Sequence, residues 1–237
     1  AFSYHNLGLV YEKIDEFESA LPYFNKSLDL EKKRKNQKGI AESLNSIGDI
    51  YFNKGLYNEA LERYESSSKI FDTIKEESGF ATTLKNLASV YSKKGQNEKA
   101  DELYQKSLDI HSRLGNKKEL AIVYNLFGES YGKQNKNSKA IEYCKKGLEL
   151  SKEIELVSQL KNSCECLYSA YKALGNTGMA LHYYEKMEEY NSDIRNQEVT
   201  KKLMQMEYEK QKITDSLAQE EDKLRTQLAH NEELCSE

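Results

Sequence analysis

Apolar and small residues recur along most of the chain at a fixed spacing of 40 residues. Three positions of this unit recur five times without insertion or deletion, and positions are numbered here from Ala1. The recurring residues are Leu7, Ile47, Leu87, Phe127 and Leu167 at position 7, Tyr11, Tyr51, Tyr91, Tyr131 and Tyr171 at position 11, and Ala20, Ala60, Ala100, Ala140 and Ala180 at position 20. A period of this length predicts an array of stacked structural units.

Two further positions recur with one exception each. Position 8 is small in Gly8, Gly48, Ala88 and Gly128, but the fifth unit has Tyr168 there. Position 24 is aromatic in Phe24, Tyr64, Tyr104 and Tyr184, but the fourth unit has Cys144 there. A small residue lets a neighbouring helix approach closely, and an aromatic side chain fills the space beside it. The two positions therefore predict a close helix–helix contact inside each unit.

The apolar and small residues of each unit are spaced as in two successive amphipathic helices. In the first unit two sets of residues recur at helical spacing, namely Tyr4, Leu7, Gly8 and Tyr11, followed by Ala20, Phe24, Ser27 and Leu28. Position 15 separates the two sets and carries Gly, Asn or Asp, which tolerate the left-handed backbone of a helix end. These residues are Asp15, Gly55, Gly95, Asn135 and Gly175.

The pattern resembles the tetratricopeptide repeat (TPR) in its 40-residue form. The resemblance covers residues 1 to about 192, and the fifth copy departs from it most, at Cys164, Tyr168 and Met187. It implies an all-α, right-handed superhelical solenoid of helix-turn-helix repeats. The five repeats are expected at residues 1–40, 41–80, 81–120, 121–160 and 161–192.

Residues 193–237 do not continue the repeat, and from Ile194 to Leu234 they lack Pro and Gly, so we expect one long helix. A heptad seam of apolar residues follows this segment, at Val199, Leu203, Met206, Ile213, Leu217, Leu224 and Leu234, with Lys210, Glu220, Gln227 and Asn231 interrupting it. We expect Val199, Leu203, Met204 and Met206 to cover the last repeat as a cap. The later part is then a candidate coiled coil that forms a weak homodimer through residues 199–234.

Residues 208–217 also resemble the connector helix of bacterial membrane sensors that contain TPRs. That resemblance implies the sensory or interaction region of a larger signal-transduction protein, with its output domain outside this chain. The second, third and fourth repeats are each preceded by a lead-in segment, and no such segment precedes Ala1. We therefore expect the natural chain to begin further upstream.

Composition narrows the classes of function. Lys and Arg total 35 and Asp and Glu total 39, a net charge of −4, which argues against a nucleic-acid partner. No apolar stretch approaches the roughly 18 residues of a transmembrane helix, so no membrane segment is expected within the chain. The sequence does not decide the cellular compartment: the chain is either cytoplasmic or the extracytoplasmic part of a sensor.

The sequence contains no recognisable catalytic or metal-binding motif. The histidines His5, His111, His182 and His230 lack metal-ligand spacing, and no phosphate-binding or nucleophile motif is present. Cys164 and Cys166 lie about 200° apart around a helix. We expect Cys144 and Cys164 to be buried free thiols, with a Cys144–Cys164 bond as the less favoured alternative. The prediction is a non-enzymatic protein with no catalytic residues, no cofactor and no metal.

The working surface expected from the TPR resemblance is the concave face, which the first helix of each repeat lines with positions 2, 5, 6, 9, 12 and 13. Asn recurs there, and its amide can both donate to and accept from a peptide backbone. We therefore predict a groove that binds a protein or peptide ligand. The candidate residues are Asn6, Asn45, Asp49, Lys85, Asn86, Ser89, Lys93, Asn125, Glu129 and Lys133. Two alternatives stay open: the polar residues form only a solvated face, and the chain is a structural adaptor that oligomerises through its C-terminal helix.

Overall fold

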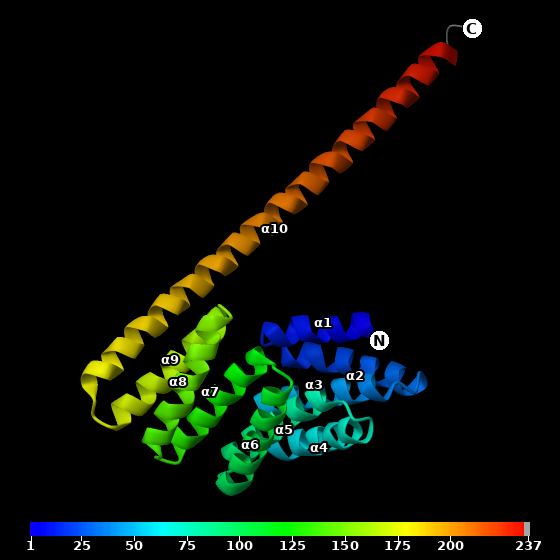
Figure 1. Ribbon diagram of the computed structural model, residues 1–237. Helices are drawn as coiled ribbons and strands as arrows, with labels where there is room; N and C mark the ends of the chain where they lie inside the picture. Colours follow the sequence, from blue (N-terminus) through cyan, green and yellow to red (C-terminus); the bar gives the residue numbers. More distant parts are fainter. Residues whose placement is uncertain (235–237) are drawn as a thin grey trace. The chain divides into compact units, whose positions relative to one another are not determined.

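The computed structural model describes the backbone of residues 1–234 and the side chains of residues 1–207 and 209–212. The chain is all-helical over this range (Figure 1). The first helices of the five repeats are α1 (Phe2–Lys13), α3 (Gln37–Asn53), α5 (Glu77–Lys93), α7 (Lys117–Lys133) and α9 (Val157–Ala173). The second helices are α2 (Phe17–Lys33), α4 (Tyr57–Thr73), α6 (Asn97–Arg113), α8 (Asn137–Glu153) and the start of α10 (Thr177–Leu234). The all-α helical-repeat fold predicted from the sequence is confirmed.

The chain divides into two compact units, Ala1–Glu188 and Glu189–Glu237. The first unit contains the repeats and the first turns of α10. Tyr183 in those turns stacks on Tyr171 of α9, with ring centroids 5.6 Å apart. The second unit is the remainder of α10.

Position 15 ends the first helix of each repeat in the left-handed region. The φ values are 75° at Gly55, 73° at Gly95 and 72° at Gly175, and they are 60° at both Asp15 and Asn135, as the sequence predicts. A second set at position 35 has the same backbone, with φ of 54° at Lys35 and 53° at Glu155. Gly115 at the same position favours this conformation, but Lys and Glu have no intrinsic preference for it, so the residue types of the other copies gave no signal for this second turn.

Small residues at positions 8 and 20 bring the two helices of a repeat together. Ala20, Ala60, Ala100 and Ala140 have no exposed surface. A methyl group added at Gly48 would lie 2.6 Å from the ring of Tyr64, so no larger residue fits there. The rings of Tyr64 and Tyr104 are 1% and 2% exposed, and burying each contributes about 2 kcal/mol.

The stack bends toward its first helices. Among the helices that the structure describes, α1, α3, α5, α7 and α9 contact one another in succession, whereas α2, α4, α6 and α8 contact only first helices. The first helices therefore lie closer together than the second helices do. They form the concave layer of the repeat unit.

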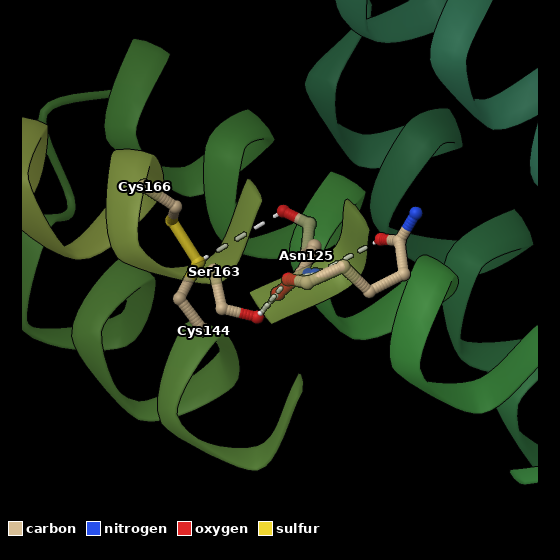
Figure 2. Close-up of a disulfide and its surroundings, with 5 residues drawn as sticks. Asn125, Cys144, Ser163 and Cys166 are labelled. Carbon is tan, nitrogen blue, oxygen red and sulfur yellow. Dashed lines mark hydrogen bonds between the residues drawn. A yellow bond between two sulfur atoms is a disulfide. The ribbon is translucent and has the colours of Figure 1, made fainter. Parts of the chain in front are cut away.

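A disulfide joins Cys144 of α8 to Cys166 of α9, with Cα atoms 6.2 Å apart (Figure 2). The expected free thiol at Cys144 and the alternative Cys144–Cys164 bond are both wrong. Only one of Cys164 and Cys166 can face α8, because they lie about 200° apart around α9. Cys166 is the one that does, and Cys164 is buried outside this bond. A cross-link over 22 residues stabilises the folded state by about 3 kcal/mol in the chain-entropy account.

The start of the seam on α10 is exposed. Val199, Leu203, Met204 and Met206 are between 55% and 65% exposed and belong to the second compact unit, so their expected role as a cap on the last repeat stays a prediction. The side chains of Ile213, Leu217, Leu224 and Leu234 lie outside the described residues, and so does that of His230. Within the described part of the chain, no helix is both long and apolar enough to cross a membrane.

We predict that Ala100→Arg destabilises the repeat unit by about 3 kcal/mol or more. Ala100 is fully buried in a core cluster with Tyr104 and Phe127, so the variant forces a charge into a helix contact. Thermal unfolding followed by circular dichroism measures the effect. Gln105→Arg, at an exposed position of the same helix, is the matched control. An unchanged melting temperature for Ala100→Arg would contradict the assigned repeat register.

Candidate peptide-binding groove

Two hollows open along the layer of first helices. The α1–α5 hollow has a volume of about 230 Å³. It is lined by Glu12, Asp49, Phe52, Asn53, Tyr64, Lys85, Asn86, Ser89 and Leu126. The α7–α9 hollow is larger, at about 460 Å³. Its lining residues are Gly128, Glu129, Gly132, Lys133, Asn137, Ala140, Glu165, Cys166, Ser169, Ala170 and Ala173.

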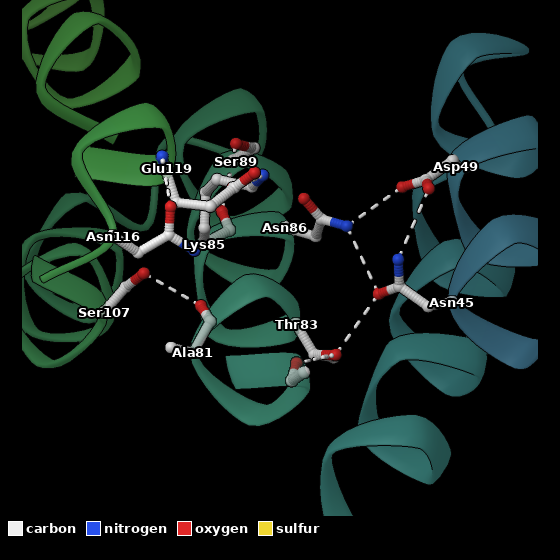
Figure 3. Close-up of polar contacts among 11 residues, drawn as sticks. Asn45, Asp49, Ala81, Thr83, Lys85, Asn86, Ser89, Ser107, Asn116 and Glu119 are labelled. Atoms are coloured by element: carbon white, nitrogen blue, oxygen red, sulfur yellow. Dashed lines mark hydrogen bonds and ion pairs between the residues drawn. The ribbon is translucent and has the colours of Figure 1, made fainter. Parts of the chain in front are cut away.

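Polar side chains link α3 to α5 at the first hollow (Figure 3). The Asn86 amide donates to Asn45 Oδ1 at 3.2 Å and to Asp49 Oδ1 at 3.0 Å. The hydroxyl of Tyr64 donates to the same Asp49 oxygen at 2.6 Å. Asn45 and Asn86 therefore hold successive repeats together, and both are only partly buried. Their amides have a structural role in addition to any contact with a ligand.

Charges of both signs lie at this hollow. Lys85 forms an ion pair with Glu119 at the start of α7, with Nζ and Oε2 3.0 Å apart. Burial raises the pKa of Asp49 to about 6, although the Tyr64 hydrogen bond and the charge of Lys85 oppose that shift. Burial, together with repulsion from Asp49, raises the pKa of Glu12 to about 7. The two carboxyl groups therefore change charge near neutral pH.

Asn125 does not face the groove as predicted. It is 2% exposed and connects α7 to α9 (Figure 2). Its Oδ1 accepts from the Ser163 hydroxyl at 2.8 Å, and its amide donates to the carbonyl oxygen of Gln159 at 3.3 Å. Position 27 explains this burial. It is serine in the first three repeats and Gly147 in the fourth, where a methyl group would collide with Asn125 Oδ1.

The other predicted residues lie at the surface of the repeat unit. Ser89 is partly buried, and its hydroxyl lies 2.9 Å from that of Tyr104. Glu129 and Lys133 are exposed at the edge of the α7–α9 hollow. Asn6 and Lys93 are exposed on α1 and α5. Apart from Asn125, the candidate residues are therefore accessible in part or in full.

Four residues at or beside these hollows, all on first helices, were not predicted from the sequence: Glu12, Glu119, Gly132 and Cys166. Glu12, Gly132 and Cys166 occupy positions 12 and 6, which belong to the concave set. Applying that set to every repeat would have found these three. Glu119 lies at the start of α7, outside the set, and only the ion pair with Lys85 identifies it.

His111 is a buried polar group beside this face. It has no exposed surface, and neither ring nitrogen has a hydrogen-bond partner among the described residues. Burial lowers the pKa of His111, with the charge of Glu119 opposing and that of Lys85 adding to the shift. The ring therefore stays neutral near pH 7. Within the described residues, no group of three or more His, Cys, Asp or Glu side chains is arranged to hold a metal ion.

We predict that Asn125→Ala lowers the free energy of unfolding by about 1 to 3 kcal/mol, because it removes the buried amide that accepts from Ser163 and donates to Gln159. Urea denaturation measures the change. Asn6→Ala removes an exposed amide from α1 and should change stability by less than about 0.5 kcal/mol. Equal effects of the two substitutions would contradict the structural role of Asn125.

The chain resembles known repeat proteins in sequence and in structure. A family model described as tetratricopeptide repeat matches residues 1–73 and 79–153. None of the curated proteins compared with the chain matches it.

Solved structures show the same fold. The crystal structure of BtubC (BKLC) from P. vanneervenii superposes with a TM-score of 0.65 at 20% identity, covering 80% of this chain and 78% of that one. A putative kinesin light chain from Podosopora anserina, with nearly identical TPR-like repeats, gives 0.61 at 17% identity, covering 81% and 95%. Aspartyl phosphate phosphatase F from Bacillus subtilis gives 0.60 at 14% identity, covering 79% and 58%. At these identities the likeness concerns the fold alone.

The family match extends over most of four of the repeats, and the helix pairs have the contacts that the repeat pattern requires. The chain therefore belongs to the tetratricopeptide repeat family.

Proposed function

We propose that the repeat unit binds a polar segment of a partner protein along its first helices. The observation that carries this proposal is the pair of hollows on the concave layer, each lined by side chains from successive repeats. A ligand in extended or helical conformation could contact both hollows. TPR proteins in general act as protein-binding scaffolds, which supports the assignment.

The charges along this face favour a peptide over a nucleic acid. Glu12 and Asp49 lie at the first hollow together with Lys85, and Glu129 lies beside Lys133 at the second. A phosphate backbone would require an unbroken basic row. A polar peptide, with backbone groups of both hydrogen-bonding types, suits the mixed row of amides, carboxylates and ammonium groups.

A narrower proposal concerns the larger protein to which this chain belongs. We infer that the chain is the sensory or interaction region of a larger bacterial signal-transduction protein. The support is the resemblance of residues 208–217 to a sensor connector, together with the unbroken helix that α10 forms through those residues. Most of the side chains in that stretch lie outside the described residues.

We predict that Asn86→Ala weakens the binding of peptides selected on this chain from a displayed random library by about fivefold or more. The loss of roughly 1 kcal/mol corresponds to one hydrogen bond between the Asn86 amide and the ligand. Fluorescence anisotropy with labelled peptides measures the affinities. Circular dichroism must first show that the variant is folded, because Asn86 also bonds to Asn45 and Asp49.

Gln105→Ala is the matched control, since it removes an exposed amide from the second helix α6. It should leave peptide affinity unchanged. If Gln105→Ala abolishes binding while Asn86→Ala binds normally, the ligand does not occupy the groove.

Self-association through α10 is a second candidate function. The observation in its favour is the exposure of three seam residues, 57% at Val199, 55% at Leu203 and 65% at Met206. Apolar side chains that recur at heptad spacing on one exposed helix face favour pairing with a second helix. Lys210 interrupts this seam, so the expected dimer is weak.

We predict that the double variant Val199→Asp/Leu203→Asp is monomeric at concentrations where the unmodified chain forms some dimer. Light scattering over a concentration series measures the mass. Met204→Asp is the control, because Met204 is 64% exposed but lies outside the seam. A chain that stays monomeric at high concentration, or that dimerises equally well in all three forms, would exclude this adaptor role.

A further inference from the structure

The aromatic residue at position 24 does more than fill the core in the second and third repeats. Its ring packs under position 8, and its hydroxyl reaches the side chain at position 9 on the concave face. The hydroxyl of Tyr64 donates to Asp49 at 2.6 Å, and the hydroxyl of Tyr104 lies 2.9 Å from that of Ser89. Each ring therefore runs from the core to the floor of the groove.

The fourth repeat lacks this ring. Cys144 occupies position 24, and its sulfur lies against Gly128, where the rings of the other repeats begin. The disulfide to Cys166 continues from that point into α9 (Figure 2). Glu129, at position 9, therefore has no position-24 hydroxyl to correspond with that of Tyr64.

The α7–α9 hollow shares lining positions with the surroundings of the Tyr64 ring. Its lining includes Gly128, Glu129 and Ala140, which correspond to Gly48, Asp49 and Ala60 around the ring of Tyr64. Small residues extend the space further, since Gly132 stands where the second repeat has Phe52. Ala170 and Ala173 form the side toward α9. The hollow is larger than a single phenol ring and leaves room for the backbone that carries it.

We propose that this hollow binds a tyrosine side chain of the partner segment. The ring lies over Gly128, Gly132 and Ala170, and the hydroxyl donates to Glu129 as the hydroxyl of Tyr64 donates to Asp49. The inference rests on the proposed peptide-binding function and specifies one residue of the ligand.

The lining favours this occupant over three others. Phenylalanine has no hydroxyl to donate to the Glu129 carboxylate. A phosphorylated tyrosine would bring its phosphate against both Glu129 and Glu165. A lysine side chain would be attracted by Glu129 and Glu165, but its ammonium group would also meet that of Lys133, and its narrow stem would leave much of the apolar floor uncovered. A phenol matches both the apolar floor and the carboxylate at its edge.

The test is a titration of the isotopically labelled chain with N-acetyl-tyrosinamide, followed by amide NMR. We expect saturable shifts centred on Gly128, Gly132 and Ala170, with a dissociation constant in the millimolar range. N-acetyl-phenylalaninamide should bind about three- to tenfold more weakly, because it lacks one hydrogen bond to a charged acceptor. The Glu129→Ala variant should bind the two amides equally.

Two glycine substitutions distinguish the hollow from general surface binding. Gly132→Leu fills the hollow, and its added Cβ meets only the Ala140 methyl at 3.9 Å, so the helix accepts it. Gly178→Leu places the same side chain at an exposed helical site with nothing within 4 Å. We expect tyrosinamide binding to be lost in the first variant and kept in the second.

The inference is overturned by unsaturable or scattered shifts, by undiminished binding in Gly132→Leu, or by tighter binding of N-acetyl-phosphotyrosinamide. The titration uses a single amino-acid amide, so it reports on the hollow even when no longer segment binds the groove. Library peptides that bind the groove without enrichment of tyrosine would also overturn it and would leave the proposed peptide-binding function intact.

Discussion

The contact between the small residue at position 8 and the aromatic ring at position 24 sets the distance between the two helices of a repeat. Gly48 and Tyr64 illustrate it, because any side chain at Gly48 would overlap the ring. This spacing determines how closely the next repeat can stack, and it brings the Tyr64 hydroxyl within reach of the concave face. Packing in the core and the chemistry of the groove therefore depend on the same pair of positions.

The fourth repeat shows what happens when this pair changes. Cys144 replaces the ring, and a covalent bond to Cys166 takes over the connection to the next repeat. Gly147 replaces a serine, and the Asn125 amide moves into the vacated space to bond α9. Two losses of side-chain volume are thus compensated by specific bonds, and the remaining volume forms the larger hollow.

The repeat period predicted most of the fold, because positions 8, 11, 20 and 24 report directly on helix packing. It also predicted the left-handed turns at position 15, where Gly, Asn and Asp mark the conformation. The turn at Lys35 was not predictable, since tertiary packing imposes its backbone on a residue with no preference for it. For the candidate groove, periodicity identified the helix face but not the burial of Asn125 or the pairing of Cys144 with Cys166. Each depends on a neighbouring side chain that is smaller than in the other repeats. The recurrence of residue types at equivalent positions does not reveal what fills the space that such a change leaves.

The carboxyl groups of Glu12 and Asp49 have a consequence for how the repeats respond to acid. Their pKa values, about 7 and about 6, lie above those of an unfolded chain, so folding takes up protons at this pair near neutral pH. Mild acidification consequently favours the folded form of the first two repeats. His111 has the opposite effect. Burial lowers its pKa, so the folded protein binds a proton at this ring less readily than the unfolded chain does. A drop in pH across this range therefore stabilises the folded form of the first two repeats and destabilises the middle of the array, where His111 lies.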